Sequence, residues 1–158
     1  MRLAKHATSL SRQITAPPKL STTRLFSAVP TLREKYYTES HEWIELASDK
    51  KTGSIGISAH AASALGDIVF VELPEKGASL QASDVMGAVE SVKSASDLYI
   101  PVGGTIVETN TKLEETPGLI NKSPEDEGWI VKIELAKGEV DTVEKLMNAD
   151  QYKEKISE

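Results

Sequence analysis

Lys93 is the residue whose setting in the sequence most favours chemistry. It lies in the stretch 87–97, GAVESVKSASD, where apolar and small residues run into a serine-rich break before a strand pattern resumes at 98–100. Two strand patterns around a short polar break predict a β-hairpin, with Lys93 near its tip. A stiff hairpin holds an amine where a modifying enzyme can find it and where it can enter the active sites of other proteins.

Acidic residues frame this lysine. Glu90 lies three residues before it and Asp97 four residues after it, while the neighbouring lysines in the sequence, Lys76 and Lys112, are far away. The same spacing also fits a lysine that only keeps a hairpin tip solvated. Residue types and spacing therefore support an exposed amine on a hairpin, and they assign no reaction to it.

Other side chains offer little catalytic chemistry. The chain has no cysteine, which excludes disulfides and cysteine nucleophiles, and no glycine-rich phosphate loop is present. The hairpin serines lack a nearby histidine and a nucleophile-elbow pattern, so they are better explained as turn residues (Ser91, Ser94 and Ser96). The histidines show no metal-ligand spacing (His6, His41 and His60). We therefore expect neither a metal site nor an enzyme.

Short strands must position these residues. Seven to nine strand patterns, with turn residues every eight to twelve positions, predict a mainly β sandwich or barrel with a few short helices. Strict alternation in the hairpin would place Val85, Gly87 and Val89 on one face. Apolar strand patterns predict core positions for three aromatic residues (Trp43, Phe70 and Trp129).

Capping residues mark the expected helices. Ser58 is expected to cap a helix over 59–65 that Gly66 ends. Asn148 is expected to cap a C-terminal helix that ends near residue 156. A preceding helix, ending near residue 147, would be capped by Asp141 with Glu144.

Charge separates the N-terminus from the rest of the chain. Residues 1–33 contain six Lys or Arg, many Ser and Thr, and no Asp or Glu, a composition typical of a mitochondrial or plastid transit peptide; a disordered basic tail is the alternative. We expect 1–30 to be a transit peptide, disordered or removed, with a cut near 24–27, and 31–158 to be one domain.

The rest of the chain is acidic. From residue 27 onward, 13 basic residues face 24 acidic ones. That balance argues against nucleic acid or an anionic membrane as a partner. No apolar run approaches the roughly 18 residues that a membrane-spanning helix needs.

The hairpin segment ESVKSASD (90–97) resembles the lipoylation site of the H proteins of the glycine cleavage system. Three further segments match that family in the same order: YTESHEWI (37–44), GDIVFVELP (66–74), and PGLIN (117–121) with GW (128–129). The resemblance therefore covers roughly residues 34–156. It implies a lipoyl-domain-like barrel-sandwich hybrid of two antiparallel sheets, with short helices, a C-terminal helical segment, and the lysine on an edge hairpin.

The resemblance also implies a function. Lipoic acid would be attached covalently to Lys93. The carrier would take the aminomethyl group of glycine from a pyridoxal-phosphate decarboxylase to a tetrahydrofolate-dependent aminomethyltransferase, and then pass electrons to dihydrolipoamide dehydrogenase, in the mitochondrial matrix. A lipoate-attaching enzyme would be a further partner.

Individual residues receive roles from the same resemblance. Ser40, Glu42 and Asp97 would form a cleft that shields the loaded arm. Glu90, Ser94 and Asp97 would serve recognition during lipoylation. Ordinary roles also fit these types, since Ser40 could break a strand and the acids could simply be solvated.

Other carrier domains and another role for this one are the alternatives. Biotinyl domains flank their lysine with methionines and lipoyl domains of 2-oxoacid dehydrogenases show an Asp-Lys pair, whereas Val92 and Ser94 flank Lys93. A role as lipoyl donor for other mitochondrial complexes fits the same sequence.

One departure from the family concerns 124–128, PEDEG, which lacks the aromatic that many relatives carry after the proline. Partner contacts through this loop are therefore unsupported.

Overall fold

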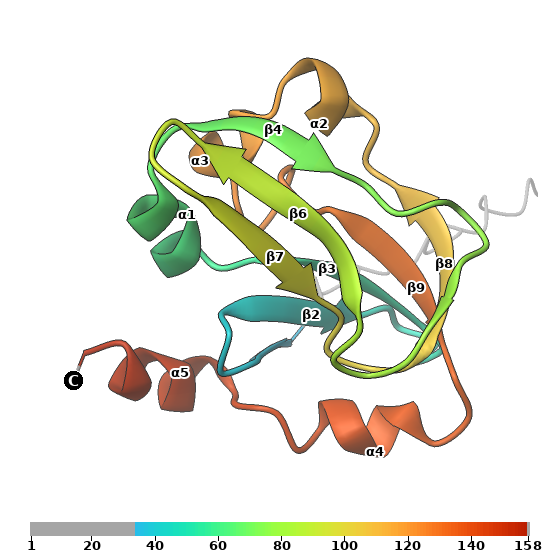
Figure 1. Cartoon of the computed structure of the whole chain (residues 1–158). Helices are drawn as coiled ribbons and strands as arrows, with labels where there is room; N and C mark the ends of the chain where they lie inside the picture. Colours follow the sequence, from blue (N-terminus) through green and yellow to red (C-terminus); the bar gives the residue numbers. More distant parts are fainter. Residues whose placement is uncertain (1–33, 158) are drawn as a thin grey trace, which may run out of the picture. The chain divides into compact units, whose positions relative to one another are not determined.

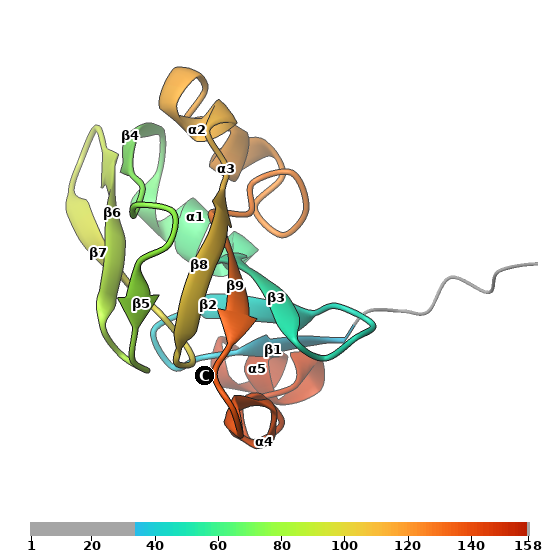
Figure 2. The same cartoon turned by 90° about the vertical axis from the view of Figure 1, so that its right-hand side faces the viewer.

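The computed structural model describes residues 34–157. The predicted transit peptide over 1–30 and its cut near 24–27 lie outside the described residues. Two antiparallel sheets face each other (Figures 1 and 2). The larger sheet contains, in spatial order, β1 (Lys35–Tyr37), β2 (Glu42–Leu46), β3 (Thr52–Ile57), β9 (Val131–Leu135), β8 (Gly104–Thr109) and β5 (Ser79–Leu80).

The smaller sheet carries the predicted lysine hairpin. Its order is β4 (Ile68–Glu72), β6 (Val85–Ser91) and β7 (Ala95–Tyr99), and β6 and β7 pair antiparallel around a short turn. The prediction of a mainly β sandwich of two antiparallel sheets is thus confirmed.

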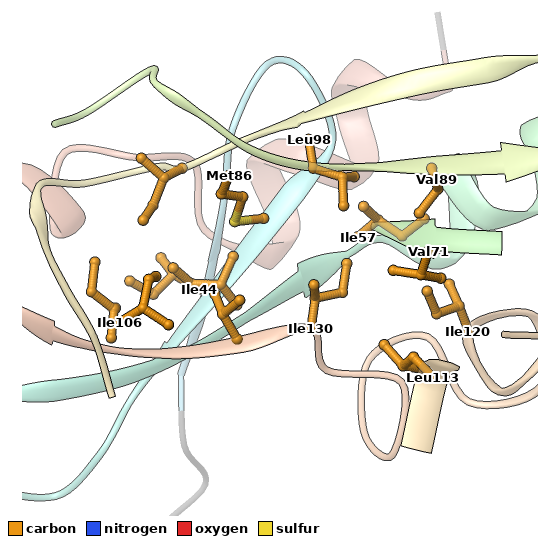
Figure 3. Packing of buried hydrophobic residues seen from close by; sticks show 14 of the residues in the cluster. Ile44, Ile57, Val71, Met86, Val89, Leu98, Ile106, Leu113, Ile120 and Ile130 are labelled. Carbon is orange, nitrogen blue, oxygen red and sulfur yellow. The ribbon is translucent and has the colours of Figure 1, made fainter. Parts of the chain in front are cut away.

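Apolar side chains from both sheets fill the space between them (Figure 3). The larger sheet contributes β-branched residues and the smaller sheet contributes Met, Val and Leu, all buried (Ile44, Ile55 and Ile133; Met86, Val89 and Leu98). Burial of each such side chain stabilises the fold by about 1.5–3 kcal/mol. This core holds the two sheets in a fixed relation and so fixes where the hairpin lies.

A β-bulge corrects the expected pattern of the hairpin. The register of β6 against β7 shifts between Val85 and Gly87, and a bulge changes which face the following residues present. Met86 and Val89 are therefore both buried, whereas Val85 is 51% exposed. The prediction that Val85 and Val89 share one face was wrong.

A second bulge changes the placement of Phe70. The register of β4 against β6 shifts between Ile68 and Phe70, and Phe70 is 51% exposed, paired with Glu90. Its predicted place in the core was wrong. Trp43 is buried as expected, and the half-buried Trp129 packs against a small cluster beside it.

Two of the helices follow their capping signals. Helix α1 (Ala59–Leu65) is capped by Ser58, whose Oγ accepts from the N–H of Ala61 at 3.1 Å, and it ends at Gly66. Helix α5 (Ala149–Lys155) begins with a capping box formed by Asn148 and Gln151. Both predictions are confirmed.

The other helices are single turns. These are α2 (Lys112–Glu115), α3 (Leu119–Lys122) and α4 (Glu139–Val143). Helix α4 follows Gly138, which adopts a left-handed conformation and offers no side-chain cap. The expected cap by Asp141 and Glu144 was wrong, because both residues lie within or after that helix. Among residues 34–157, no helix is long and apolar enough to cross a membrane.

Helix α5 is anchored to the edge of the larger sheet. The ring of Tyr152 stacks on that of Tyr37 in β1, with centroids 4.3 Å apart and planes 7° apart. Met147, just before α5, forms an antiparallel bridge with Tyr37. In Figure 1, α5 accordingly lies below β2, on the side of the larger sheet away from β6 and β7.

Candidate functional site

Lys93 lies in the turn between β6 and β7, and its side chain is exposed. The hydroxyl oxygen of Ser91 accepts hydrogen bonds from the N–H groups of Lys93 and Ser94, at 3.1 and 3.0 Å. The Ser91 N–H donates to the Ser94 carbonyl at 2.7 Å. This serine therefore closes the turn with its own side chain, as expected of a turn residue, and fixes the backbone under the lysine.

The lysine lies over the end of α1. A Cβ built on Gly66 would be 3.7 Å from the Nζ and Cε atoms of Lys93. The hairpin is tied to the same corner of the fold, because the N–H of Val92 donates to the carbonyl of Asp67 at 3.1 Å. The amine thus lies beside the C-terminal end of a helix, where a positive charge is favoured.

Asn121, in α3, braces this corner, and sequence reasoning assigned it no role of its own. Its amide nitrogen donates to the carbonyl of Gly66 at 2.7 Å, and its amide oxygen accepts from the N–H of Ile68 at 2.9 Å. One side chain therefore bonds to the backbone on both sides of the α1–β4 turn. Its place inside the matched segment PGLIN was the only signal that could have pointed to it.

A cavity of about 180 Å³ lies where the β1–β2 connection, α1 and the hairpin meet; we call it the α1 cleft. It is lined by Ser40, His41, Glu42, Ile57, Ala61, Ala64, Leu65, Val89, Ser96, Asp97 and Leu98. Ser40, Glu42 and Asp97, which the resemblance assigns to a shielding cleft, are thus brought to one cavity. Helix α1 supplies part of its wall and ends under Lys93.

Glu42 is a buried acid, and each of its two carboxylate oxygens accepts a hydrogen bond. It is 2% exposed. Its Oε1 accepts from the N–H of Tyr99 at 3.1 Å, and its Oε2 accepts from the hydroxyl of Thr38. The role of a solvated surface acid does not fit this residue. Since Thr38 and Tyr99 come from opposite sides of the sandwich, Glu42 also links the two sheets.

The lining of the α1 cleft has two parts. Ile57, Leu65, Val89 and Leu98 present apolar side chains, while Ser40 and Glu42 supply oxygens. An apolar chain that ends in a polar or cationic group matches such a cavity. A neighbouring cavity of about 350 Å³ shares Ser40 and Glu42. It is otherwise lined by residues 37–39, 83, 99–101 and 145–147.

The three residues expected to serve lipoylation lie around the lysine in different ways. Ser94 is in the turn itself. Glu90 is exposed and pairs with Phe70 across the smaller sheet. Asp97 is exposed, pairs with Ala88, and lines the α1 cleft. The structure therefore places Glu90 outside the cleft and Asp97 on its border.

His41 is a cleft residue that sequence reasoning missed. Its ring Nδ1 is 2.7 Å from the hydroxyl of Tyr152, and its carbonyl accepts from the N–H of Ser58 at 2.9 Å. Burial lowers the pKa of His41, nearby His60 and Lys155 lower it further, and Glu42 acts in the opposite direction. The ring of His41 therefore has a hydrogen-bond partner within the fold. Within the described residues, no His, Asp or Glu cluster could hold a metal ion.

Comparison with known proteins gives the family. The glycine cleavage H-protein family model matches residues 35–158. Mitochondrial glycine cleavage system H protein 2 of Arabidopsis thaliana is 47% identical over 129 residues, covering 82% of this chain and 80% of the relative. The mitochondrial H protein of Saccharomyces cerevisiae is 47% identical over 121 residues, covering 76% and 71%.

A solved structure agrees. The crystal structure of a glycine cleavage system H protein from Mycobacterium marinum superimposes with a TM-score of 0.71 at 36% identity, covering 78% of this chain and 97% of that one. The expected lipoyl-domain-like fold is thereby confirmed. With its matched sequence, its two-sheet sandwich and its lysine hairpin, the chain belongs to the glycine cleavage H-protein family, the non-catalytic lipoyl carriers of the glycine cleavage system.

Proposed function

We propose that Lys93 is the covalent attachment site of lipoic acid. An exposed turn that Ser91 holds in place presents its amine, and the side chain lies over Gly66, next to Leu65, which lines the α1 cleft. An amide bond at Nζ removes the ammonium charge and adds an apolar arm. The dithiolane of that arm supplies the redox and group-transfer chemistry, while the chain supplies position.

The α1 cleft is the proposed resting place of the loaded arm. One observation carries this proposal: Ser40, Glu42 and Asp97 line the same cavity, next to the helix end that lies under Lys93. The aminomethyl cargo is a cation that water hydrolyses. A buried carboxylate attracts a cation more strongly than a solvated one does, and the apolar wall excludes water from the carbon that would be attacked.

Glu90, Ser94 and Asp97 are proposed to serve recognition by the lipoate-attaching enzyme. All three are exposed and lie within four residues of Lys93. A ligase must bind the hairpin before any arm exists, so it depends on residues that remain accessible around the amine. Glu90 and Ser94 do not line the α1 cleft, so their role would be recognition only, whereas Asp97 would serve both.

The proposed partners are the other components of the system. These are the pyridoxal-phosphate glycine decarboxylase, the tetrahydrofolate-dependent aminomethyltransferase and dihydrolipoamide dehydrogenase. A tethered arm raises the local concentration of its cargo at each of their active sites. The proposed location is the mitochondrial matrix, with residues 1–30 as the transit peptide. The basic, acid-free N-terminus and the mitochondrial relatives support this location.

Mass spectrometry of protein purified from its native compartment tests the assignment. We expect a lipoyl mass increment on the peptide that contains Lys93 and an N-terminus trimmed within residues 1–30. A mature protein with an unmodified Lys93 would refute the carrier role. A biotinyl increment on the same peptide would refute the identity of the cofactor.

A further inference from the structure

We propose that Tyr152, on the C-terminal helix α5, is a positioning residue for the α1 cleft and acts through His41. The inference rests on the proposed role of that cleft in holding the loaded arm. Tyr152 does not itself line the cleft, whereas His41 does, between Ser40 and Glu42. Helix α5 would thereby set how long the carrier retains its cargo.

A chain of hydrogen bonds connects α5 to the cleft. The hydroxyl of Tyr152 lies 2.7 Å from Nδ1 of His41 and 2.7 Å from the Oγ of Ser58. The Oγ of Ser58 also accepts from the N–H of Ala61, in the first turn of α1. One phenol group therefore contacts both the β1–β2 connection and the start of the helix that forms a wall of the cleft.

His41 needs such a restraint because its backbone is strained. Its φ angle is +74°, in the left-handed region that residues other than glycine rarely adopt. Its N–H donates to the carbonyl of Thr38 at 3.3 Å, a long bond, and its carbonyl accepts from Ser58 at 2.9 Å. The bond to Tyr152 is the contact that fixes its ring. Without it, the backbone at 40–42 can relax and move the oxygens of Ser40 and Glu42.

The ring of Tyr152 stays in place without its hydroxyl. It is buried, it stacks on Tyr37 at 4.3 Å, and Lys155 of the same helix lies 3.7 Å from the carboxylate of Glu39. Tyr152→Phe therefore removes the bonds to His41 and to Ser58 and leaves the docking of α5 intact. Tyr37→Phe is the matched control, since it removes the hydroxyl of the other ring of the stacked pair. That hydroxyl donates to Glu125 at 2.8 Å.

The charge state of His41 belongs to this arrangement. His60 of α1 faces the His41 ring, with ring centroids 5.0 Å apart. Tyr152 and Lys155 of α5 and Glu42 of β2 are the other titratable groups near it. Asp97 borders the same cavity from β7. A neutral imidazole between Ser40 and Glu42 leaves the carboxylates free to attract the cationic cargo, while a protonated one competes with it. Fixing the ring therefore affects retention and its pH dependence together.

Two measurements test the proposal. The first follows ammonium released from aminomethyl-loaded carrier without tetrahydrofolate; hydrolysis adds one water and yields the free thiol, formaldehyde and ammonium. We expect Tyr152→Phe to release about two- to tenfold faster than wild type, the factor that one ordinary buried hydrogen bond corresponds to, with an altered pH profile. Tyr37→Phe should stay within about twofold of wild type.

The second measurement uses the unlipoylated protein, so it does not depend on the arm. Long-range ¹H–¹⁵N spectra should show one dominant tautomer of His41 in wild type and in Tyr37→Phe, and a mixture in Tyr152→Phe. His60 serves as the internal reference. An unchanged His41 spectrum in Tyr152→Phe would overturn the proposal.

The outcomes separate this inference from the cleft itself. If wild type releases ammonium as fast as a loaded free lipoyl-lysine, the proposed cleft function fails. If wild type is protected but Tyr152→Phe matches it, only the role of Tyr152 fails. Equal acceleration by Tyr37→Phe would show that general loosening of α5, and not the bond to His41, controls release.

Discussion

Oε1 of Glu42 in β2 accepts a hydrogen bond from the backbone N–H of Tyr99 in β7, at 3.1 Å, and so joins the larger sheet to the smaller one. The same carboxylate lines the α1 cleft. One buried charge therefore serves the packing of the sandwich and the chemistry proposed for the cleft. Substitutions that keep its shape should separate the two roles.

Glu42→Gln should affect the cargo much more than the fold. The amide oxygen can still accept from Tyr99 and the amide nitrogen can donate to the Thr38 hydroxyl, so we expect the free energy of unfolding to change by less than about 1 kcal/mol. Loss of the charge should speed release of the aminomethyl cargo on the order of tenfold. Urea denaturation and ammonium release measure the two effects.

Glu42→Ala is the comparison for that variant. It leaves the Tyr99 N–H without its partner, so it should cost about 1–3 kcal/mol and speed release as well. Lipoylation of both variants should be normal. An unchanged release rate in Glu42→Gln would remove the charge of Glu42 from the proposed cleft.

Lys93→Arg should abolish lipoylation and leave the fold unchanged. An exposed turn residue tolerates this substitution within about 0.5 kcal/mol, while the guanidinium is not a substrate for acylation. Intact-protein mass spectrometry and thermal unfolding check the two expectations, with Lys112→Arg as the control. A lipoyl increment that persists, or an unfolded variant, would contradict the placement of the site.

Gly66→Ala should destabilise the corner beneath Lys93. Gly66 has φ 80° and ψ −153°, a conformation open almost only to glycine, so we expect a cost of about 1–3 kcal/mol. Gly118→Ala is the control, because Gly118 has φ −62° and open space around its Cβ position. Equal stability of the two variants in urea would show that the turn after α1 is not strained.

Stability should fall on mild acidification, and His41 should contribute to the fall. Burial lowers the pKa of His41 below its ordinary value of 6.5, so the unfolded chain binds this proton more tightly than the folded one. The contribution is complete above pH 6.5 and is lost as the pH falls through the folded pKa. Between pH 7.5 and 5.5, wild type should lose more unfolding free energy than His41→Asn, which tolerates a positive φ. If the unfolding free energies of wild type and His41→Asn fell in parallel with pH, His41 would not contribute to the pH dependence.

Deletion of residues 1–30 should block mitochondrial import without changing the fold. These residues precede the segment that the family model matches, so the melting temperature should be unchanged. Import into isolated mitochondria should be lost and should return when an unrelated transit peptide is fused to residue 31. Import of the shortened chain by itself would refute the assignment of residues 1–30.

Features with local causes could be predicted from the sequence. Helices α1 and α5 start where Ser58 and Asn148 can cap them, because a side-chain cap involves only the next three residues. The lysine turn is also local, since Ser91 closes it through residues two and three positions later. Family resemblance added the names of the cleft residues, which spacing could not supply.

Features that depend on partner strands could not be predicted from the sequence. Phe70 and Val85 turned outward because bulges shift the register of β4 and β6, and a bulge depends on what the neighbouring strand offers for pairing. Helix α4 began without a side-chain cap, after Gly138. The left-handed backbone of His41 likewise had no local signal.

An exposed lysine on a tight hairpin, within a mainly β domain of the H-protein family, could be recognised from the order of residues alone. That Ser40, Glu42 and Asp97 share a cavity, that Glu42 is buried, and that α5 reaches His41 became visible only in the folded chain. The two groups of features differ in the sequence separation of the contacts that stabilise them. A turn or a cap is stabilised by neighbours in the chain, whereas the cleft exists because burial of the core holds β2, α1 and β7 together.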